Sequence, residues 1–373
     1  MAHAKPKLQL IVRANQSPTP PSALLTKLVS VLLLVPLLLT GCQKAATQPD
    51  QTPQAGPSNQ VTAVGYPLSF FAQQLVDESI KIHAVLPKQG SLASWRPSRD
   101  EILSMQKSDI IFINGSAAPF ASWLPHVTLP ESKVCATAND GLKLSDMISV
   151  EDIRIVHSHG PEGEHSHPTM VAYTWLDPAI AAKQVAIMAK RLTTTYPKLK
   201  SSIADKQQKL TDELKKLSKA VKTVNLHLAL KKISIGEKSP TTMLTDSPNL
   251  KFLTRVLGVN DIHLNWSKGL STSEAEIQLK EKLSSLASRP EFMLFADEPT
   301  AELRSVAESF QLNVIVMNSM ASATSDSNYF HVMSENLNRL KPTYEIEAKD
   351  KIKPKHKNDA EQAKPNVSDP EQN

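Results

Sequence analysis

Residues 198–224 read KLKSSIADKQQKLTDELKKLSKAVKTV and, after Pro197, predict one long polar helix. Five apolar residues recur along it at spacings of three, four and seven: Ile203, Leu210, Leu214, Leu217 and Val221. This spacing predicts a narrow apolar seam on an otherwise charged rod of about 40 Å, at 1.5 Å per residue. We favour a rod that joins two lobes. A coiled coil of three heptads is the alternative.

Strand-like and helix-like patterns alternate on both sides of this rod. The continuous apolar run Ile110–Ile113 suits a buried parallel strand. Strands are predicted at 61–64, 110–113, 292–295 and 314–317, and helices at 67–80, 99–107, 178–192 and 301–310. This rhythm predicts an α/β fold class, with two doubly wound α/β lobes bridged by the long α-helix.

The amino terminus has the pattern of a secretion signal. Residues 28–39 read LVSVLLLVPLLL, which is too short for a bilayer that needs about 20 residues, and only basic charges precede it. Leu39-Thr40-Gly41-Cys42 resembles the bacterial lipoprotein signal, in which the cysteine is lipidated. We expect attachment to a membrane through lipidated Cys42, in the periplasm or at the cell surface. A plain signal peptide with an incidental cysteine is the alternative.

Composition divides the chain of 373 residues into segments. A Gln/Pro/Ser/Thr-rich tether and a charged, Pro-containing tail flank the predicted lobes. The expected segments are a lipoprotein signal peptide (1–41), a disordered tether (42–60), an N-terminal lobe (61–196), an interlobe helix (197–224), a C-terminal lobe (225–344) and a disordered tail (345–373). With Cys42 lipidated, Cys135 has no disulfide partner, and its small apolar neighbours predict a buried free thiol.

The basic charge gives no support for a nucleic-acid partner. Four basic residues precede Cys42, so the formal net charge of +5 falls to +1 for the remainder. Only 5% of the residues are aromatic. A near-neutral mature chain therefore lacks the electrostatic footprint of a nucleic-acid-binding protein.

The most chemically informative stretch is residues 157–167, HSHGPEGEHSH, which holds four of the 11 histidines. Residues i and i+2 of an extended backbone share a face, so each His-x-His pair can offer two imidazoles to one ion. The Gly-Pro turn can bring the pairs together in the tetrahedral arrangement that zinc favours. We predict that His157, His159, His165 and His167 capture Zn²⁺, more weakly below about pH 6.5. A solvated polar loop without a ligand is the alternative.

Five stretches in the same order resemble the zinc/manganese solute-binding lipoproteins of ABC importers (cluster A-I type). They are Val61–Leu75, Trp95–Gly115 with SDIIFING, Tyr173–Pro178 reading YTWLDP, Phe295–Pro299, and Val314–Lys341 with NYFHVMSENLNRLK. The resemblance covers about residues 61–341. It implies two lobes with a metal in the cleft between them, and delivery of Zn²⁺, or alternatively Mn²⁺, to a permease with its ATPase. We expect a monomer.

Zinc-binding members typically hold the ion with three histidines and one acidic residue. The resemblance places Ser91, Tyr173 and Ser247 at the histidine positions, and Glu298 or its neighbour Asp297 at the acidic one. Among these we retain Glu298, Asp297 and Tyr173 as candidate metal residues. Whether a histidine elsewhere substitutes, His227 or His263, stays open.

Two other classes of function compete with metal delivery. A transport-inactive relative of the same fold could serve as a surface metal buffer, adhesin or interaction module, and the replaced histidines favour that alternative. An enzyme is not expected, because the sequence lacks His-Glu-x-x-His, Gly-x-Ser-x-Gly, Walker and Gly-x-Gly-x-x-Gly patterns.

Overall fold

The computed structural model describes residues 58–87, 95–115, 123–158, 164–237, 239–266, 270–322 and 328–344; the side chains of Pro125 and of residues 150–170 are not described. The predicted signal peptide, lipidated Cys42 and charged tail therefore lie outside the described residues, as does nearly all of the tether. Within the described ranges, no helix combines the length and the apolar character needed to cross a membrane.

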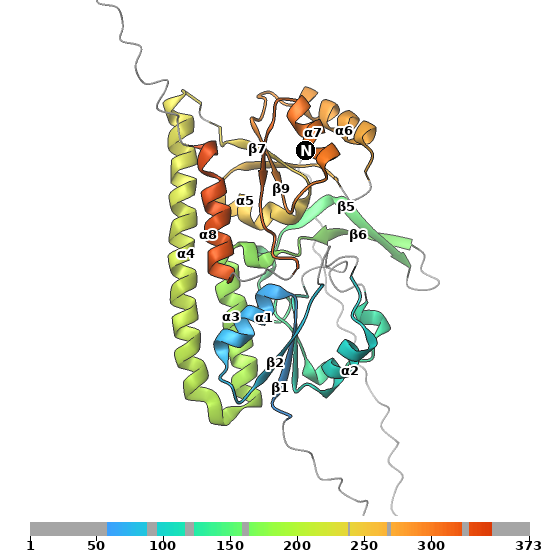
Figure 1. Ribbon diagram of the computed structural model, residues 1–373, viewed down its shortest axis with the longest axis vertical. Helices are drawn as coiled ribbons and strands as arrows, with labels where there is room; N and C mark the ends of the chain where they lie inside the picture. Colours follow the sequence, from blue (N-terminus) through green and yellow to red (C-terminus); the bar gives the residue numbers. More distant parts are fainter. Residues whose placement is uncertain are drawn as a thin grey trace, which may run out of the picture. The chain divides into compact units, whose positions relative to one another are not determined.

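The first sheet has four parallel strands in the order β2-β1-β3-β4. They are β1 (Gln60–Val64), β2 (Lys81–Val85), β3 (Ile110–Ile113) and β4 (Val134–Ala136). Helix α1 (Tyr66–Leu75) and helix α2 (Arg99–Lys107) follow β1 and precede β3 (Figure 1). Alternate residues of β3 contribute to two separate hydrophobic clusters, Ile110 to one and Ile111 to the other. Both faces of the sheet are therefore covered, as in a doubly wound fold.

The second sheet repeats this design with the order β10-β9-β7-β8, again all parallel. Its strands are β7 (Thr242–Thr245), β8 (Asn260–His263), β9 (Phe292–Phe295) and β10 (Asn313–Val316). Its helices are α5 (Lys251–Leu257), α6 (Thr272–Ser284), α7 (Ala301–Ser309) and α8 (Tyr329–Arg339). Met293 packs in a cluster with α6 and α7, whereas its neighbour Leu294 belongs to the main core.

Two long helices lie beside these sheets, α3 (Pro178–Thr195) and α4 (Lys200–Ser234). Helix α4 has 35 residues and is therefore about 50 Å long. It packs against α1 and α3 as well as α5 and α8, so it bridges the two lobes as predicted (Figure 1). The five residues of the predicted seam are all buried, and the seam continues through Val224 and Leu228.

Four helices end at other residues than the sequence pattern predicts. Two differences are small: α3 ends at Thr195 instead of Leu192, and α7 at Ser309 instead of Phe310. Helix α4 continues ten residues beyond Val224, the predicted end, to Ser234. Helix α1 ends at Leu75 instead of Ile80. The Asp77 carboxylate accepts a hydrogen bond from the Ser79 backbone N–H (3.0 Å), which turns the chain there. Val76 and Ile80 remain buried beyond that end, and their spacing imitates another helical turn.

An antiparallel pair, β5 (Ser149–Ser158) and β6 (Glu164–Met170), makes a separate two-stranded sheet between the halves of the chain (Figure 1). The four predicted strands agree with β1, β3, β9 and β10 to within one residue at each end. Helix α2 has the predicted bounds because Ser98 and Glu101 form a reciprocal capping box at its start.

The prediction of a buried free thiol is confirmed for Cys135. Burial raises the pKa of this thiol to about 12.

Candidate functional site

Two carboxylates lie at the carboxyl edge of the second sheet. Asp246 follows β7 directly, and Asp297 follows β9 by two residues. The two strands are adjacent and parallel, with Thr245 paired to Leu294, so both acidic residues reach the same edge. The backbone N–H of Ala296 donates to Oδ1 of Asp246 at 3.1 Å and joins the two strand ends.

The Asp246 carboxyl is poised to change its charge near neutral pH. Its pKa is raised to about 7, chiefly because burial disfavours the charged form and also because Asp297 places a second negative charge nearby. Hydrogen bonds from the Ala296 backbone and from Ser247 act in the opposite direction but do not cancel burial. A cation at this edge would favour the ionised form of Asp246.

Asp297 is held by a buried serine. The Ser319 hydroxyl, on a side chain with 0% exposure, lies 2.8 Å from Oδ1 and 3.0 Å from Oδ2 of Asp297. The Ser319 carbonyl in turn accepts a hydrogen bond from the indole Nε1 of Trp175 at 2.9 Å. One residue therefore connects the acidic edge of the second sheet to a segment that precedes α3 in the chain.

That segment is the 3₁₀ turn Thr174–Leu176, labelled η6, and it is fully packed. Trp175 is 1% exposed, and its carbonyl accepts a hydrogen bond from the hydroxyl of Tyr329, the first residue of α8, at 2.7 Å. Tyr173 stacks on Trp175 with 5.0 Å between ring centroids. The YTWLDP stretch therefore lies against two elements of the second lobe.

A neutral hydrogen-bond network fixes η6 to the first sheet. The side-chain amide of Asn114, at the end of β3, donates to the Ala172 carbonyl at 2.6 Å. The Thr174 hydroxyl lies 2.9 Å from the amide oxygens of both Asn114 and Gln184, and Gln184 donates to Thr137 at 2.7 Å. Asn114, Thr137, Thr174 and Gln184 are all 0% exposed. Buried amides and hydroxyls satisfied in this way make a rigid support.

An ion pair adds a further connection between the lobes. Asp177 caps the first turn of α3 by accepting from the Ala179 backbone N–H at 2.9 Å. Its other oxygen lies 3.1 Å from the guanidinium of Arg255 on α5. The same guanidinium donates to the Asp146 carbonyl at 3.1 Å. The end of α5 is thereby tied to the start of α3.

The candidate cleft residues from the sequence occupy different environments. Tyr173 is buried and stacked, Ser247 donates to Asp246 at 3.3 Å, and Asp297 is held by Ser319. Glu298 has a side chain that is 69% exposed and pairs with Arg304 of α7 at 2.6 Å. Ser91 lies outside the described residues. The structure thus brings Asp297 and Ser247 together around Asp246, while Glu298 is directed toward α7.

The histidine-rich stretch forms the ends of β5 and β6 that face each other. His157 is paired with His165, and Ile155 with His167, in antiparallel register. Positions 165 and 167 share a face of β6, and position 157 is opposite the first of them. The backbone therefore aligns three of the four predicted ligand positions. His159 lies outside the described residues.

The two histidines left open as substitutes lie in other surroundings. His227 is an exposed residue of α4 whose ring lies 5.1 Å from that of Tyr344. His263 ends β8, opposite Thr245 in register, and lines a surface hollow with residues of α6. Among the residues whose side chains are described, no group of three or more His, Cys, Asp or Glu residues is arranged to hold a metal ion.

Sequence reasoning missed Asp246 as a functional candidate. The residue was visible only as the neighbour of Ser247, since a carboxylate after a short strand is common. The signal that identifies it is spatial: β7 lies next to β9, so two carboxylates reach one edge.

The protein has two lobes, each built on a parallel four-stranded sheet, and one helix bridges them. An acidic sheet edge lies where the lobes pack together. These features define the two-lobed solute-binding class. A family comparison makes the assignment specific. The chain belongs to the family described as zinc-uptake complex component A, periplasmic, whose model matches residues 61–342. This is a family of binding proteins and not of enzymes. A comparison with curated proteins finds no matching sequence.

Solved structures share the fold at low sequence identity. The Zn(II)-bound ZnuA-like domain of AdcA from Streptococcus pneumoniae has a TM-score of 0.56 at 19% identity, covering 76% of this chain and 98% of that one. The metal-dependent lipoprotein YcdH from Bacillus subtilis has a TM-score of 0.57 at 16% identity, with coverage of 76% and 98%. A Cd-bound periplasmic metal-binding protein from Candidatus Liberibacter asiaticus has a TM-score of 0.58 at 14% identity, with coverage of 76% and 99%.

Proposed function

We propose that this protein binds a divalent metal ion outside the cytoplasm, zinc being favoured over manganese, and delivers it to an ABC importer permease driven by its ATPase. The observation that carries the proposal is the antiparallel register in which His157 is opposite His165, with His167 two positions further on. Imidazole nitrogens at such spacing suit Zn²⁺ better than Mn²⁺, which prefers oxygen ligands. Solved relatives with bound Zn(II), Cd or Mn support a divalent cation as the cargo.

In this proposal the protein handles the ion at two places. His157, His159, His165 and His167 capture it, and the acidic edge of the second sheet holds it, with Asp297 as the principal ligand and Asp246 beside it. Glu298 and Tyr173 remain weaker candidates, since one is ion-paired with Arg304 and the other stacks on Trp175. Anchoring through lipidated Cys42 would keep the loaded protein near the permease.

Equilibrium dialysis against Zn²⁺ tests the proposal. Replacing the four histidines by alanine is expected to remove the weaker binding step, and Asp246→Asn with Asp297→Asn the tighter one. A variant with His83, His126 and His331 changed to alanine is the matched control, because these histidines lie apart from each other on other elements. The proposal fails if the wild-type protein retains no Zn²⁺, or if the control loses as much as the hairpin variant.

The second candidate is a transport-inactive relative that acts as a surface metal buffer, adhesin or interaction module. The replacement of three histidine positions by Ser91, Tyr173 and Ser247 favours it, and one solved relative is the laminin-binding protein Lbp of Streptococcus pyogenes. The same dialysis distinguishes the two: a protein that keeps only the hairpin-dependent step holds no ion at the sheet edge and fits the buffer.

A further inference from the structure

The last third of α4 exposes apolar side chains on the face turned away from the core. Leu226 is 55% exposed, Leu230 is 51% exposed and Ile233 is 69% exposed. Their spacing of four and three places them on one helix face. The buried seam residues Val224 and Leu228 lie on the opposite face. This end of α4 is therefore apolar on two faces, and only one of them is used by the fold.

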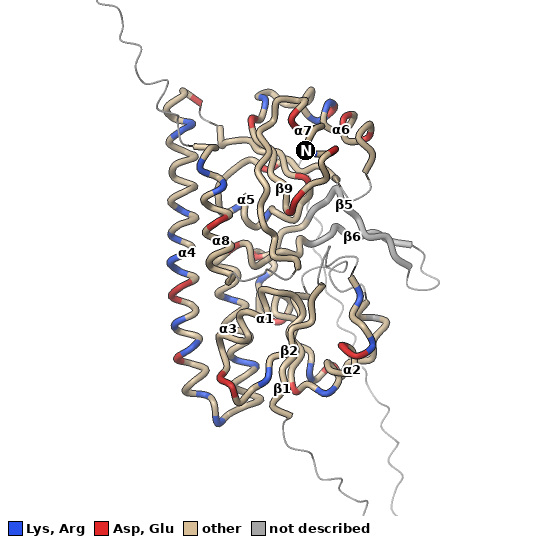
Figure 2. The backbone as a smooth tube through the Cα atoms, viewed as in Figure 1, with Lys and Arg blue, Asp and Glu red and all other residues tan. Residues whose placement is uncertain are grey.

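Lysines extend the same exposed face toward the start of the helix. Lys215, Lys219 and Lys222 precede Leu226 at spacings of four, three and four, and all three are exposed. Together with Leu226, Leu230 and Ile233 they form what we call the outer stripe. Figure 2 shows the basic residues that follow one another along α4. The outer stripe thus has a cationic half and an apolar half.

The charge of this region has one sign. Residues 214–236 contain six lysines and no aspartate or glutamate. Lys215, Lys231 and Lys232 pair with Asp212, Glu291 and Glu237 respectively. Lys219 and Lys222, in contrast, make no ion pair with any residue of the described ranges. The cationic half of the stripe therefore has charge available for an anionic partner.

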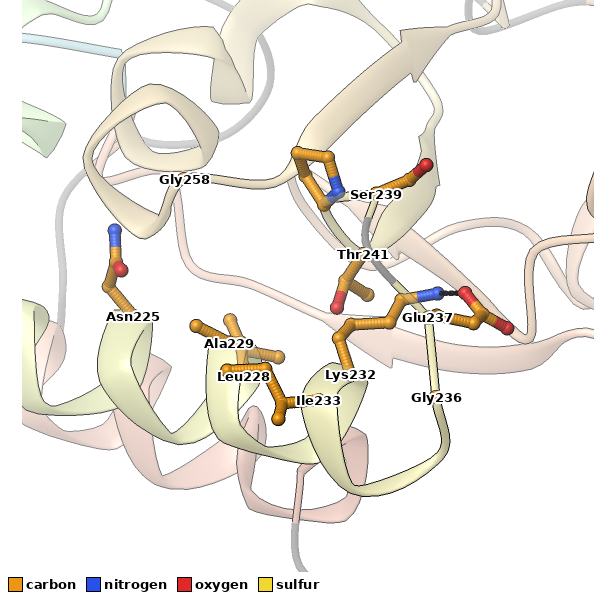
Figure 3. A pocket seen from close by; sticks show the side chains of 11 residues that line it. Asn225, Leu228, Ala229, Lys232, Ile233, Gly236, Glu237, Ser239, Thr241 and Gly258 are labelled. Atoms are coloured by element: carbon orange, nitrogen blue, oxygen red, sulfur yellow. Dashed lines mark hydrogen bonds and ion pairs between the residues drawn. The ribbon is translucent and has the colours of Figure 1, made fainter.

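A surface hollow adjoins the apolar half. It has a volume of about 590 Å³ and lies between the end of α4 and the segment that leads into β7 (Figure 3). Leu228, Ala229 and Ile233 line it on one side, and Pro240 and Gly258 on the other. Ile235, 54% exposed, follows at the end of the helix. Ile233 belongs both to the outer stripe and to the lining of the hollow, so the two surfaces meet at this residue.

We propose that the outer stripe of α4 docks on an anionic phospholipid surface. A helix face with apolar side chains and uncompensated lysines is suited to a bilayer interface, where acyl chains meet negatively charged headgroups. A second copy of the chain would bring the same excess of positive charge, so charge complementarity favours lipid. The lipid expected on Cys42 would raise the effective concentration of this weak contact. The proposal goes beyond metal delivery and does not depend on it.

Flotation with vesicles tests this docking directly. The chain used begins at position 42 and carries Cys42→Ser, so that neither the predicted signal peptide nor the predicted lipid contributes. Vesicles contain phosphatidylcholine either alone or mixed with phosphatidylglycerol. We expect flotation only with the mixed vesicles, and less at high salt. Lys219→Gln with Lys222→Gln should weaken binding about 30-fold, given the attraction expected of two lysines near an anionic surface. Leu226→Gln, Leu230→Gln and Ile233→Gln together should weaken it at least about tenfold.

The matched control removes three exposed apolar residues elsewhere: Leu103→Gln, Leu144→Gln and Ile277→Gln. It should float like the parent chain. Circular dichroism checks that each variant retains its helices. The proposal is overturned if the parent chain does not float with the mixed vesicles, or if the control loses as much binding as the stripe variant. It is also overturned if sedimentation shows a dimer that the stripe variant converts to a monomer.

Discussion

The carboxyl ends of the two sheets are built from opposite kinds of polar group. At the first sheet, Asn114 and Thr137 join Gln184 and Thr174 in a buried network of neutral amides and hydroxyls. At the second, Asp246 lies beside Asp297, and burial raises the pKa of Asp246 to about 7. The neutral network stabilises its surroundings without a ligand. The acidic edge is destabilised by its own charge, so it gains most from a cation.

Trp175 connects the two ends, and its removal should have the largest effect. Trp175→Ala is expected to lower the free energy of unfolding by about 3–5 kcal/mol, because it leaves a cavity in the core. It also removes the hydrogen bond to Ser319 and the stacking on Tyr173. Urea unfolding measures the loss. Trp175→Phe keeps a ring and should lose only about 1–2 kcal/mol. A loss below about 1 kcal/mol for Trp175→Ala would show that the two ends are stabilised independently.

The charge at the acidic edge should appear as a pH dependence of stability. A carboxyl whose pKa is about 7 when folded binds more protons than the unfolded chain between about pH 4 and pH 7. Stability should therefore fall as pH rises through that window, by up to about 4 kcal/mol in total. Asp246→Asn removes the penalty and keeps an acceptor for the Ala296 N–H. Urea unfolding at about pH 5 and about pH 8 makes the comparison. Equal slopes for both proteins would contradict it.

The neutral network should respond to truncation without any pH dependence. Gln184→Ala removes partners of Asn114, Thr137 and Thr174 and leaves buried polar atoms unpaired. We expect a loss of about 1–3 kcal/mol. Lys190→Ala, at an exposed position of the same helix, is the control and should stay within about 0.5 kcal/mol. If the loss of unfolding free energy changed with pH between about 5 and 8, a titratable group would have to contribute at the first sheet as well, which would contradict the prediction.

The smallest effect is expected at Glu298. Its side chain is 69% exposed and forms a surface ion pair with Arg304. Glu298→Gln should change stability by no more than about 0.5 kcal/mol. It should also leave Zn²⁺ affinity unchanged in equilibrium dialysis, whereas Asp297→Asn should weaken it at least about tenfold. If the order of the two affinities is reversed, Glu298 and not Asp297 is the acidic ligand.

Much of the fold could be predicted from periodicity alone. The apolar run of β3 and the seam of α4 are strong signals because burial on both faces, or on one stripe, requires them. The signal fails where apolar residues serve another purpose. Exposed Leu226, Leu230 and Ile233 disturb the amphipathic pattern of α4, so its last ten residues were not recognised as helix. Six strands, β2 and β4 to β8, were not predicted. Among them β2 and β8 are short and only partly buried, so they lack a clear apolar pattern.

The candidate site was predictable only in part. The resemblance led to the WLDP stretch and to Asp297, and the spacing led to the hairpin histidines; as metal ligands these residues stay predictions. Asp246 could not be identified from the sequence. Its raised pKa results from burial and from Asp297, which is 51 positions away in the chain. The role of Ser319 was equally hidden, since a serine in a loop gives no signal until its contact with Asp297 is known. These contacts join residues far apart in the chain, and they form only because the order of the strands brings those residues to one sheet edge.

Cys135 is a natural probe of local opening at the edge of the first sheet. The thiol is 4% exposed in β4, and with a pKa of about 12 it is almost entirely protonated at neutral pH. An alkylating reagent can therefore reach it only when the edge of the first sheet detaches. In a chain whose other cysteine has been replaced, the rate at which Cys135 is labelled would report that opening. Any slowing of labelling by Zn²⁺ would measure how far an ion bound elsewhere in the protein restrains the first sheet.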